Sequence, residues 1–389
     1  MSYVVAAIAL IVAANGASLA FSSPAAVPEF HDIGLICRLI NEAAAECAAG
    51  AARAGWAMVV GAALAGAIAW PALRALPTTP VLTTGDGWSA RLFLVAVIAL
   101  LAIHVTFQLD HGPAVSRVDA IERVSHLISA ENLAWPLLLQ LASTQSKLRS
   151  RLLYLTPAFY IASLSPFRGV LFAVTLFGVM LPLAGQLRDR ENRRGWRGAI
   201  TNAIGLAAVC GVLGYLVYAQ TASRPGSLPG NGIYEQTLKP RIAAPLFQAY
   251  LAERLSAFTP LPDMAQEIRR KLRLTDEPSL NEFLFRRIYG AGYFGETTSL
   301  YYGEALANSR SHPLVWTTLA PLLLVWSWAM LRRRGLDAGV LFGLALWRGS
   351  LGGFATVLPA LVLQLATLLA IHLLQSRASG NRMEQGRQA

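Results

Sequence analysis

Long apolar runs without a charge are the feature that most constrains this chain. Residues 3–21 contain no charged side chain, and residues 54–73, 199–219 and 351–374 have the same character. A transmembrane helix needs about 20 mostly apolar residues to cross the hydrocarbon core. Only 14% of the residues are charged, whereas soluble domains carry about a quarter. This pattern rules out a disordered chain and argues against an ordinary soluble enzyme.

The apolar runs predict about ten membrane spans, two of them with a weaker signal. The other clear runs are residues 92–108, 152–166, 169–187 and 313–331, and the weaker ones are residues 130–146 and 336–347. Residues 3–21 lack a basic segment ahead of the apolar run. We therefore expect them to be an anchor helix and not a cleaved signal peptide.

The positions of the charged residues predict that both termini lie in the cytoplasm. With about ten spans, the basic clusters at residues 188–197 and 332–334 both fall on the cytoplasmic side, as arginine and lysine prefer. Residues 23–53 and 109–129 carry acidic side chains and fall on the outer side. The net charge of +11 is therefore mainly a signal of topology, and we expect no nucleic-acid partner.

The predicted organisation is an all-α polytopic membrane bundle with one helical cap on its outer side. Residues 1–219 hold the first seven spans, 220–312 form the cap, 313–376 hold the last three spans, and 377–389 form a basic cytoplasmic tail. Within the cap, an apolar stripe predicts a helix over residues 241–258. Another helix is predicted to begin at Ser279, which has the capping-box spacing, and to end at Gly290.

Cys37 and Cys47 share the first outer loop, which is oxidising if it faces a periplasm. On one straight helix they would be about 15 Å apart, too far to bridge. A disulfide therefore requires a helical hairpin, and the sequence leaves open whether it forms. We find no cysteine and histidine spacing typical of a metal site, so we expect neither a metal nor a cofactor.

Two arginines lie where the hydropathy predicts membrane. Arg168 and Arg348 each follow an apolar run that is too short to cross about 30 Å of hydrocarbon comfortably. Charge at that depth is costly and marks a candidate functional site, and arginine binds phosphate through two parallel hydrogen bonds. The alternative is that both side chains snorkel to lipid phosphates at the outer interface.

The cap adds further candidate ligands for a substrate. Its basic and aromatic candidates are Lys239, Arg241, Arg286, Arg287, Tyr301 and Tyr302. Solvated helix faces and cap packing are the alternatives for these side chains. Glu296 and Glu304 are the candidate general bases, because glycosyl transfer needs one group that takes the proton of the acceptor hydroxyl. Surface or capping positions are their alternatives.

A family resemblance rests on three short segments. The segment from Tyr293-Phe294-Gly295-Glu296 to Tyr302-Gly303-Glu304 and Asn308, which leads into an apolar run, resembles one in the Wzy-type O-antigen and exopolysaccharide repeat-unit polymerases. Ser165-Pro166-Phe167-Arg168-Gly169 is similar to the Gly-x-Arg element of that family, and Arg348-Gly349-Ser350 resembles its late Arg-x-Ser. This sequence has Ser165-Pro166-Phe167-Arg168 in place of Gly-x-Arg.

The resemblance implies a glycosyltransferase-C-like membrane fold and a function. The function would be polymerisation of undecaprenyl-diphosphate-linked oligosaccharides at the outer face of a bacterial inner membrane. Arg168 and Arg348, with Arg241 or Arg287, would hold the donor diphosphate, and Glu304 or Glu296 would be the base. Membrane lipid and proteins of chain-length regulation or export are the other partners implied.

Two other functions remain open from the sequence. One is a metal-dependent glycosyltransferase with a lipid-phosphate sugar donor, whose acid could come from Glu29 or Asp32. The other is a polysaccharide or lipid permease without enzymatic activity. A permease would be expected to carry paired charges along several spans, whereas the clear spans here are nearly free of charge.

Overall fold

The chain is described by a computed structural model. It describes residues 3–76, 87–111, 133–145, 148–164, 168–182, 239–271, 274–290, 300–309 and 312–388. All regular secondary structure within these ranges is helical, which confirms the predicted fold class. The predicted span at residues 199–219 lies outside them.

Among the described residues, four helices are long and apolar enough to cross a membrane. They are α1 (Tyr3–Phe21), α4 (Ala44–Arg74), α15 (Pro313–Arg333) and the segment Phe354–Gln375 of α17 (Phe354–Gln388). Each coincides with a predicted span. Their length and composition indicate a membrane protein, and the count of about ten spans stays a prediction.

The remaining predicted spans that the structure describes have shorter apolar segments. Apolar segments occur at Trp88–Ile103 within α5 (Trp88–His111), at Leu133–Ser143 and at Val170–Met180. The last of these joins α8 (Arg168–Thr175) to the π-helical turn Leu176–Met180. The helices α7 (Leu148–Leu164) and α16 (Gly339–Gly352) complete the set.

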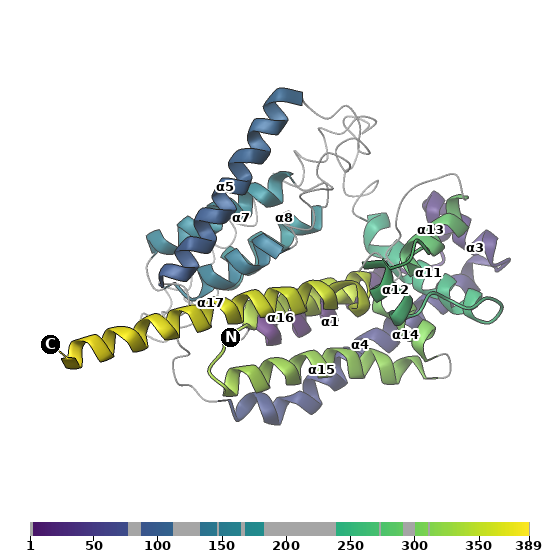
Figure 1. Cartoon of the computed structure of the whole chain (residues 1–389). Helices are drawn as coiled ribbons and strands as arrows, with labels where there is room; N and C mark the ends of the chain where they lie inside the picture. The colour runs from purple at the N-terminus through teal and green to yellow at the C-terminus, as the bar shows by residue number, and fades with distance from the viewer. Residues whose placement is uncertain are drawn as a thin grey trace, which may run out of the picture.

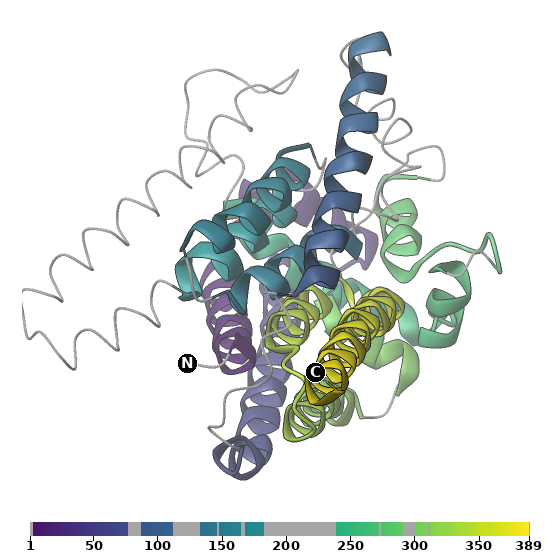
Figure 2. The same ribbon diagram turned by 60° about the vertical axis from the view of Figure 1, so that its left-hand side comes forward.

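The helices form two groups on either side of α16 and α17. In Figures 1 and 2, α5, α7 and α8 lie on one side, whereas α4 and α15 lie on the other. Small residues bring α4 and α15 close, because a Cβ at Gly61 would lie 2.5 Å from Oγ1 of Thr317. Such close backbone approach is how helices pack where no hydrophobic effect drives them together. The arrangement leaves α16 enclosed.

The loop after α1, which is predicted to lie on the outer side, folds as a helical hairpin. It contains α2 (Ala26–Glu29) and α3 (His31–Leu39), and the chain turns at Asn41, whose φ is 54°, before α4 begins. This hairpin brings Cys37 and Cys47 into a disulfide with a Cα–Cα distance of 5.8 Å. The sequence had required a hairpin for this bond, and the structure supplies it.

Four helices of the cap gather with α3 at one end of the bundle (Figure 1). They are α11 (Lys239–Ser256), α12 (Met264–Lys271), α13 (Leu280–Tyr289) and α14 (Leu300–Asn308). The predicted start of α13 is confirmed, because Oγ of Ser279 accepts a hydrogen bond from the backbone N–H of Glu282 at 3.0 Å. Its predicted end is confirmed by Gly290, whose φ is 97°.

Both chain ends point away from the cap. Figure 1 shows the N-terminus and the C-terminus toward the opposite end of the bundle. The helix α17 continues through the expected basic tail as far as Gln388. This arrangement agrees with termini on one side and a cap on the other, and the sides themselves remain a prediction.

Candidate functional site

The helix α16 is short, central and capped at both ends by other elements. Its 14 residues span about 21 Å, less than the hydrocarbon thickness of about 30 Å. At its start, Nε2 of Gln140 donates to the carbonyl of Asp337 at 2.8 Å, and Oε1 of Gln140 accepts from the backbone N–H of Val340 at 2.9 Å. At its end, the chain breaks at Gly353 and α17 begins.

Arg348 is the one charged residue of this otherwise apolar helix. From Gly339 to Ser350 the other residues are all buried, and Arg348 is half-buried. Its Cζ lies 5.7 Å from the ring centroid of Trp135. A guanidinium over an indole face is stabilised by the negative charge of the ring face. Arg348 is therefore partly enclosed by protein, and its depth in a membrane stays a prediction.

The helix α8 reaches the same turn of α16. The rings of Phe172 and Trp347 lie 5.9 Å apart between centroids, and Phe172 is one helical turn after Arg168. The backbone of Arg168 begins α8, and its side chain lies outside the described part of the chain. The structure therefore brings the two helices with the predicted arginines together, and the convergence of the two guanidinium groups stays a prediction.

The break between α16 and α17 is closed by Glu304 of α14. The carboxylate of Glu304 accepts the backbone N–H of Ala355, at 3.1 Å for Oε1 and 3.3 Å for Oε2. A helix N-terminus has unpaired N–H groups and partial positive charge, so a carboxylate there is stabilising. Gly353 has a φ of 93°, and a Cβ on it would lie 2.6 Å from Oε2 of Glu304. Only glycine fits this position without strain.

A small pocket opens at this break. Its lining comes from the start of α12, α13, α14 and the turn into α17. The described residues that line it are Pro262, Asp263, Met264, Glu267, Leu280, Asn281, Leu300, Glu304, Gly352, Gly353, Ala355 and Thr356. Nδ2 of Asn281 also donates to the carbonyl of Gly352 at 3.3 Å, which holds α13 against the end of α16.

Burial makes Glu304 a carboxylate that changes protonation near neutral pH. Glu304 is 5% exposed, and burial raises its pKa to about 7. The backbone N–H groups of Ala355 and Phe354 work in the opposite direction, and the nearby Glu267 carboxylate adds to the rise in pKa. A group with such a pKa can accept and release a proton at physiological pH, which general-base catalysis requires.

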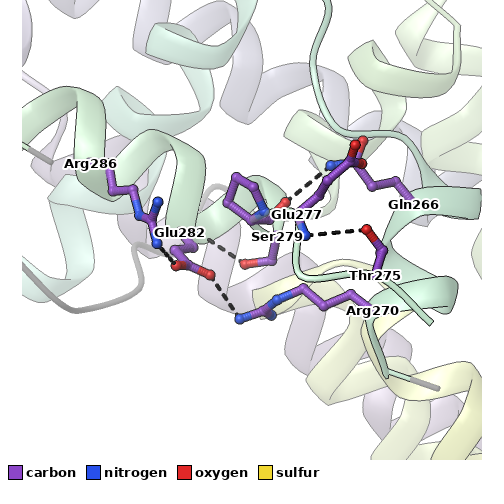
Figure 3. Close-up of polar contacts among 8 residues, drawn as sticks. Gln266, Arg270, Thr275, Glu277, Ser279, Glu282 and Arg286 are labelled. Carbon is purple, nitrogen blue, oxygen red and sulfur yellow. Dashed lines mark hydrogen bonds and ion pairs between the residues drawn. The ribbon is translucent and has the colours of Figure 1, made fainter. Parts of the chain in front are cut away.

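The cap arginines are engaged outside this pocket. Oε2 of Glu282 lies 2.8 Å from Arg270, and Oε1 of Glu282 is paired with Arg286, one helical turn further along α13. Figure 3 shows both pairs beside the loop that carries Glu277 and Ser279. The Cζ of Arg287 lies 5.3 Å from the ring centroid of Phe283. The described pocket lining therefore includes neither Arg286 nor Arg287, both expected to bind substrate.

The two candidate tyrosines hold α14 to its neighbours. The hydroxyl of Tyr301 donates to the carbonyl of Met58 in α4 at 2.7 Å, and that of Tyr302 donates to Glu253 of α11 at 3.0 Å. Burial raises the pKa of both phenols well above their ordinary value, so they remain donors. These contacts place them within the packing of the cap.

The remaining candidate site residues lie partly or wholly outside the residues that the structure describes. Lys239 and Arg241 lie in the first turn of α11, and their side chains are outside the described part, as is the whole of Glu296. The lining residues that were not singled out from the sequence include Glu267, Asn281 and Gly353. The pair Gly352-Gly353 was the available signal, because two glycines mark a helix break.

No protein-family model, no curated protein and no solved structure matches the chain. The site is therefore assigned from its own geometry.

Proposed function

We propose that this protein polymerises lipid-diphosphate-linked oligosaccharide repeat units at the outer face of a bacterial inner membrane. The observation that carries the proposal is the convergence of two distant sequence segments. Glu304 of Gly303-Glu304 closes the helix break that begins at Gly352, one helical turn after Arg348. Along the axis of α16 that turn is about 6 Å. A cationic position and a carboxylate that titrates near neutral pH thus share one end of a short central helix.

The two positions suit the two halves of a glycosyl transfer. In such a reaction the bond between the sugar C1 and the diphosphate oxygen breaks, and a bond forms between C1 and the acceptor oxygen. Arg348 stabilises the negative charge that develops on the departing diphosphate, because arginine binds phosphate oxygens strongly. Arg168 is the second arginine proposed for this role. Ionised Glu304 takes the proton from the acceptor hydroxyl.

The acidic pocket and the arginine have separate ligands in this proposal. The described lining contains Asp263, Glu267 and Glu304 and no lysine or arginine, so it repels a diphosphate and suits the hydroxyl groups of an acceptor sugar. Arg348 lies one turn away, toward the interior of the bundle. The donor diphosphate would therefore bind at the arginine, and the acceptor would bind in the pocket.

The disulfide supports the outer placement of the cap. Disulfides persist in oxidising compartments and are rare in the cytosol. The bond between Cys37 and Cys47 joins α3 to the start of α4, at the end of the bundle where the cap lies (Figure 1). Glu42, in the same hairpin, accepts a hydrogen bond from Tyr250 of α11 at 2.9 Å and lies 3.0 Å from Nε of Arg254. The hairpin and the cap thus share a compartment.

Binding of undecaprenyl diphosphate to the purified protein in nanodiscs tests the arginine assignment. Native mass spectrometry would compare the wild type with R348A. We expect R348A to weaken binding by roughly 10- to 100-fold, the usual cost of a lost hydrogen bond between charged partners.

Arg332 provides a matched control at the other end of the bundle. Its Cζ lies 5.4 Å from the ring centroid of Trp328, so it has the same kind of aromatic contact as Arg348. R332A should leave binding of undecaprenyl diphosphate unchanged. Equal binding by R348A and the wild type would remove Arg348 from the site. Preference for undecaprenyl monophosphate would favour a transferase with a lipid-phosphate donor instead.

A further inference from the structure

Tyr301 and Glu304 of α14 lie on the same face of their helix, because residues three apart in an α-helix are neighbours on its surface. Tyr301 is fully buried, and the described lining of the pocket does not include it. Its hydroxyl donates a hydrogen bond to the carbonyl of Met58 in α4 at 2.7 Å. The side chain one turn before the carboxylate therefore joins the cap to a long helix of the bundle.

The ring of Tyr301 contacts the residue at which α17 begins. The ring centroids of Tyr301 and Phe354 lie 5.5 Å apart and the ring planes meet at 76°, which is the favourable edge-to-face arrangement. Phe354 is the first residue of α17, and the backbone N–H groups of Phe354 and Ala355 are those that pair with Glu304. The start of α17 thus holds two side chains of α14, one by its ring and one by its carboxylate.

The ring of Phe354 also packs against α16 beside the proposed diphosphate ligand. A Cβ on Gly349 would clash with Cδ1 of Phe354, so the ring lies directly against the backbone of α16. Gly349 follows Arg348 in the chain. One buried ring therefore contacts both Tyr301 and the helix that carries the arginine, which connects the packing around the two proposed groups of the site.

We infer that Tyr301 is a positioning residue that fixes the Glu304 carboxylate at the start of α17 through its contacts with Met58 and Phe354. The inference rests on the proposed function for the role of Glu304 as the base. The hydroxyl holds α14 against α4, and the ring sets the rotation of α14 relative to α17. The same packing then sets the separation between the carboxylate and Arg348. Tyr301 itself does not contact the substrate.

The next residue of the same helix supplies a matched control. Tyr302 also donates one hydrogen bond from its hydroxyl, to Glu253 of α11 at 3.0 Å. Consecutive residues of an α-helix point about 100° apart, so Tyr302 lies away from the face that carries Glu304. Y301F and Y302F each remove one hydroxyl and keep the ring, and they differ in the helix from which α14 is released.

Infrared titration of the carboxyl groups in nanodisc-bound protein measures the position of Glu304 without a substrate. The wild type should show a protonated-carboxyl band that is lost near pH 7, and E304Q should lack this transition. The N–H groups at the start of α17 lower the pKa of Glu304, whereas burial and the charge on Glu267 raise it. Asp263 and Glu267, the other titratable groups of the described lining, are unchanged in all of these variants.

Y301F should move this transition to higher pH by about half a pH unit, because the carboxylate then meets the N–H groups of α17 less closely. The ring of phenylalanine fills the site, so no water enters to oppose the shift. Y302F should keep the midpoint of the wild type. An unchanged or lowered midpoint in folded Y301F would overturn the inference, and so would an equal shift in Y302F.

A rate measurement tests whether Tyr301 acts through Glu304. Y301F should lower the maximal rate of chain extension by roughly 10-fold at neutral pH, as expected for a misplaced catalytic group. In the E304Q background the same change should cost nothing more, because residues that act as a unit are not additive. A further loss of the same size in that background would show that Tyr301 acts independently, which would overturn the inference.

The ring contact has its own variant, which keeps the inference testable if Y301F does not fold. F354L keeps an apolar side chain and leaves the hydroxyl of Tyr301 intact, and it should also move the Glu304 transition to higher pH. An unchanged midpoint in F354L would deny that this ring positions the carboxylate. A shifted Y301F transition in a protein that does not polymerise its lipid-linked substrate would overturn the proposed function alone. Polymerisation with a wild-type midpoint in Y301F would overturn the positioning alone.

Discussion

Glu304 and Glu282 lie in the same cap and are the same residue type, yet their surroundings differ in every respect. Glu282 is partly exposed and has two arginines, Arg270 at 2.8 Å and Arg286 one turn along its own helix (Figure 3). Glu304 is buried, and the backbone N–H of Ala355 donates to its carboxylate. The first belongs to an ion-pair cluster at the surface, and the second is a buried acid in a pocket whose described lining holds no arginine.

This difference separates a structural carboxylate from a candidate catalytic one. An exposed ion pair contributes little to stability and costs little to maintain. A carboxylate that is buried without a cation is costly, and folds that retain one commonly use it in chemistry. The arginines of the cap surface, among them Arg286, neutralise Glu282, so a dense basic run does not by itself mark the site of an anionic substrate.

The largest expected effect is on polymerisation. E304Q should lower the rate of chain extension from undecaprenyl-diphosphate-linked oligosaccharide by at least about 100-fold, the usual contribution of a general base. E282Q should retain a rate within a few-fold of the wild type. Gel analysis of products from protein in nanodiscs measures both. Similar loss in the two variants would show that the cap needs every carboxylate for its structure.

The next effect is on stability as a function of pH. The pKa of Glu304 is raised from 4.5 in the unfolded chain to about 7 in the folded protein, so the folded state binds the extra proton more tightly. Stability should therefore be highest below about pH 4.5 and fall as the pH rises to about 7, by on the order of 3 kcal/mol.

Thermal unfolding in detergent across this pH range measures how stability changes with pH. E304Q should flatten this dependence, because the amide does not titrate, whereas E282Q should keep it. A slope that survives in E304Q would assign the pH dependence to other groups.

Replacement of Gly353 tests the close approach at the helix break. G353A adds a methyl group that would lie 2.6 Å from Oε2 of Glu304, at a φ of 93°. Gly335 has a φ of 85°, and a methyl group there would meet no described atom within 4 Å, so G335A carries the backbone strain alone. We expect G335A to cost about 1 kcal/mol and G353A about 2 to 3 kcal/mol. If G353A and G335A lowered the free energy of unfolding equally, the close contact between position 353 and Glu304 would be contradicted.

The smallest effect is expected for the surface cluster. Arg286 is 42% exposed in its side chain, and its pair with Glu282 joins residues one turn apart on α13. R286A should change the free energy of unfolding by about 0.5 kcal/mol or less, and high salt should remove even that difference. A loss of several kcal/mol would mean that this cluster holds the cap together.

Much of the fold follows from patterns that are local in the sequence. The apolar runs predicted helices wherever the structure describes them, and Ser279 with Gly290 predicted the limits of α13, because periodicity and capping depend on near neighbours. From the sequence, a disulfide between Cys37 and Cys47 was possible only if the chain formed a hairpin there. Whether the hairpin forms could be learned only from the structure. Whether short helices such as α16 cross a membrane also depends on packing, which local patterns do not specify.

The site was predicted in part, and the missing part is tertiary. Arg348 and Glu304 were chosen for their residue types and motifs, and the structure places Arg348 one turn before the helix break to which Glu304 binds. Glu267 was not chosen, since it stands in a charged stretch next to Arg269 and Arg270 that is typical of a solvated face. Its burial depends on α14 and α17, neither of which is adjacent to α12 in the sequence.

The most direct test of the account is a density map of the nanodisc-bound protein with undecaprenyl diphosphate. The account predicts diphosphate density within hydrogen-bonding distance of the Arg348 guanidinium, with the pocket at Glu304 open beside it. Diphosphate density at the exposed cap arginines, or at the end of the bundle that carries Arg332, would contradict it.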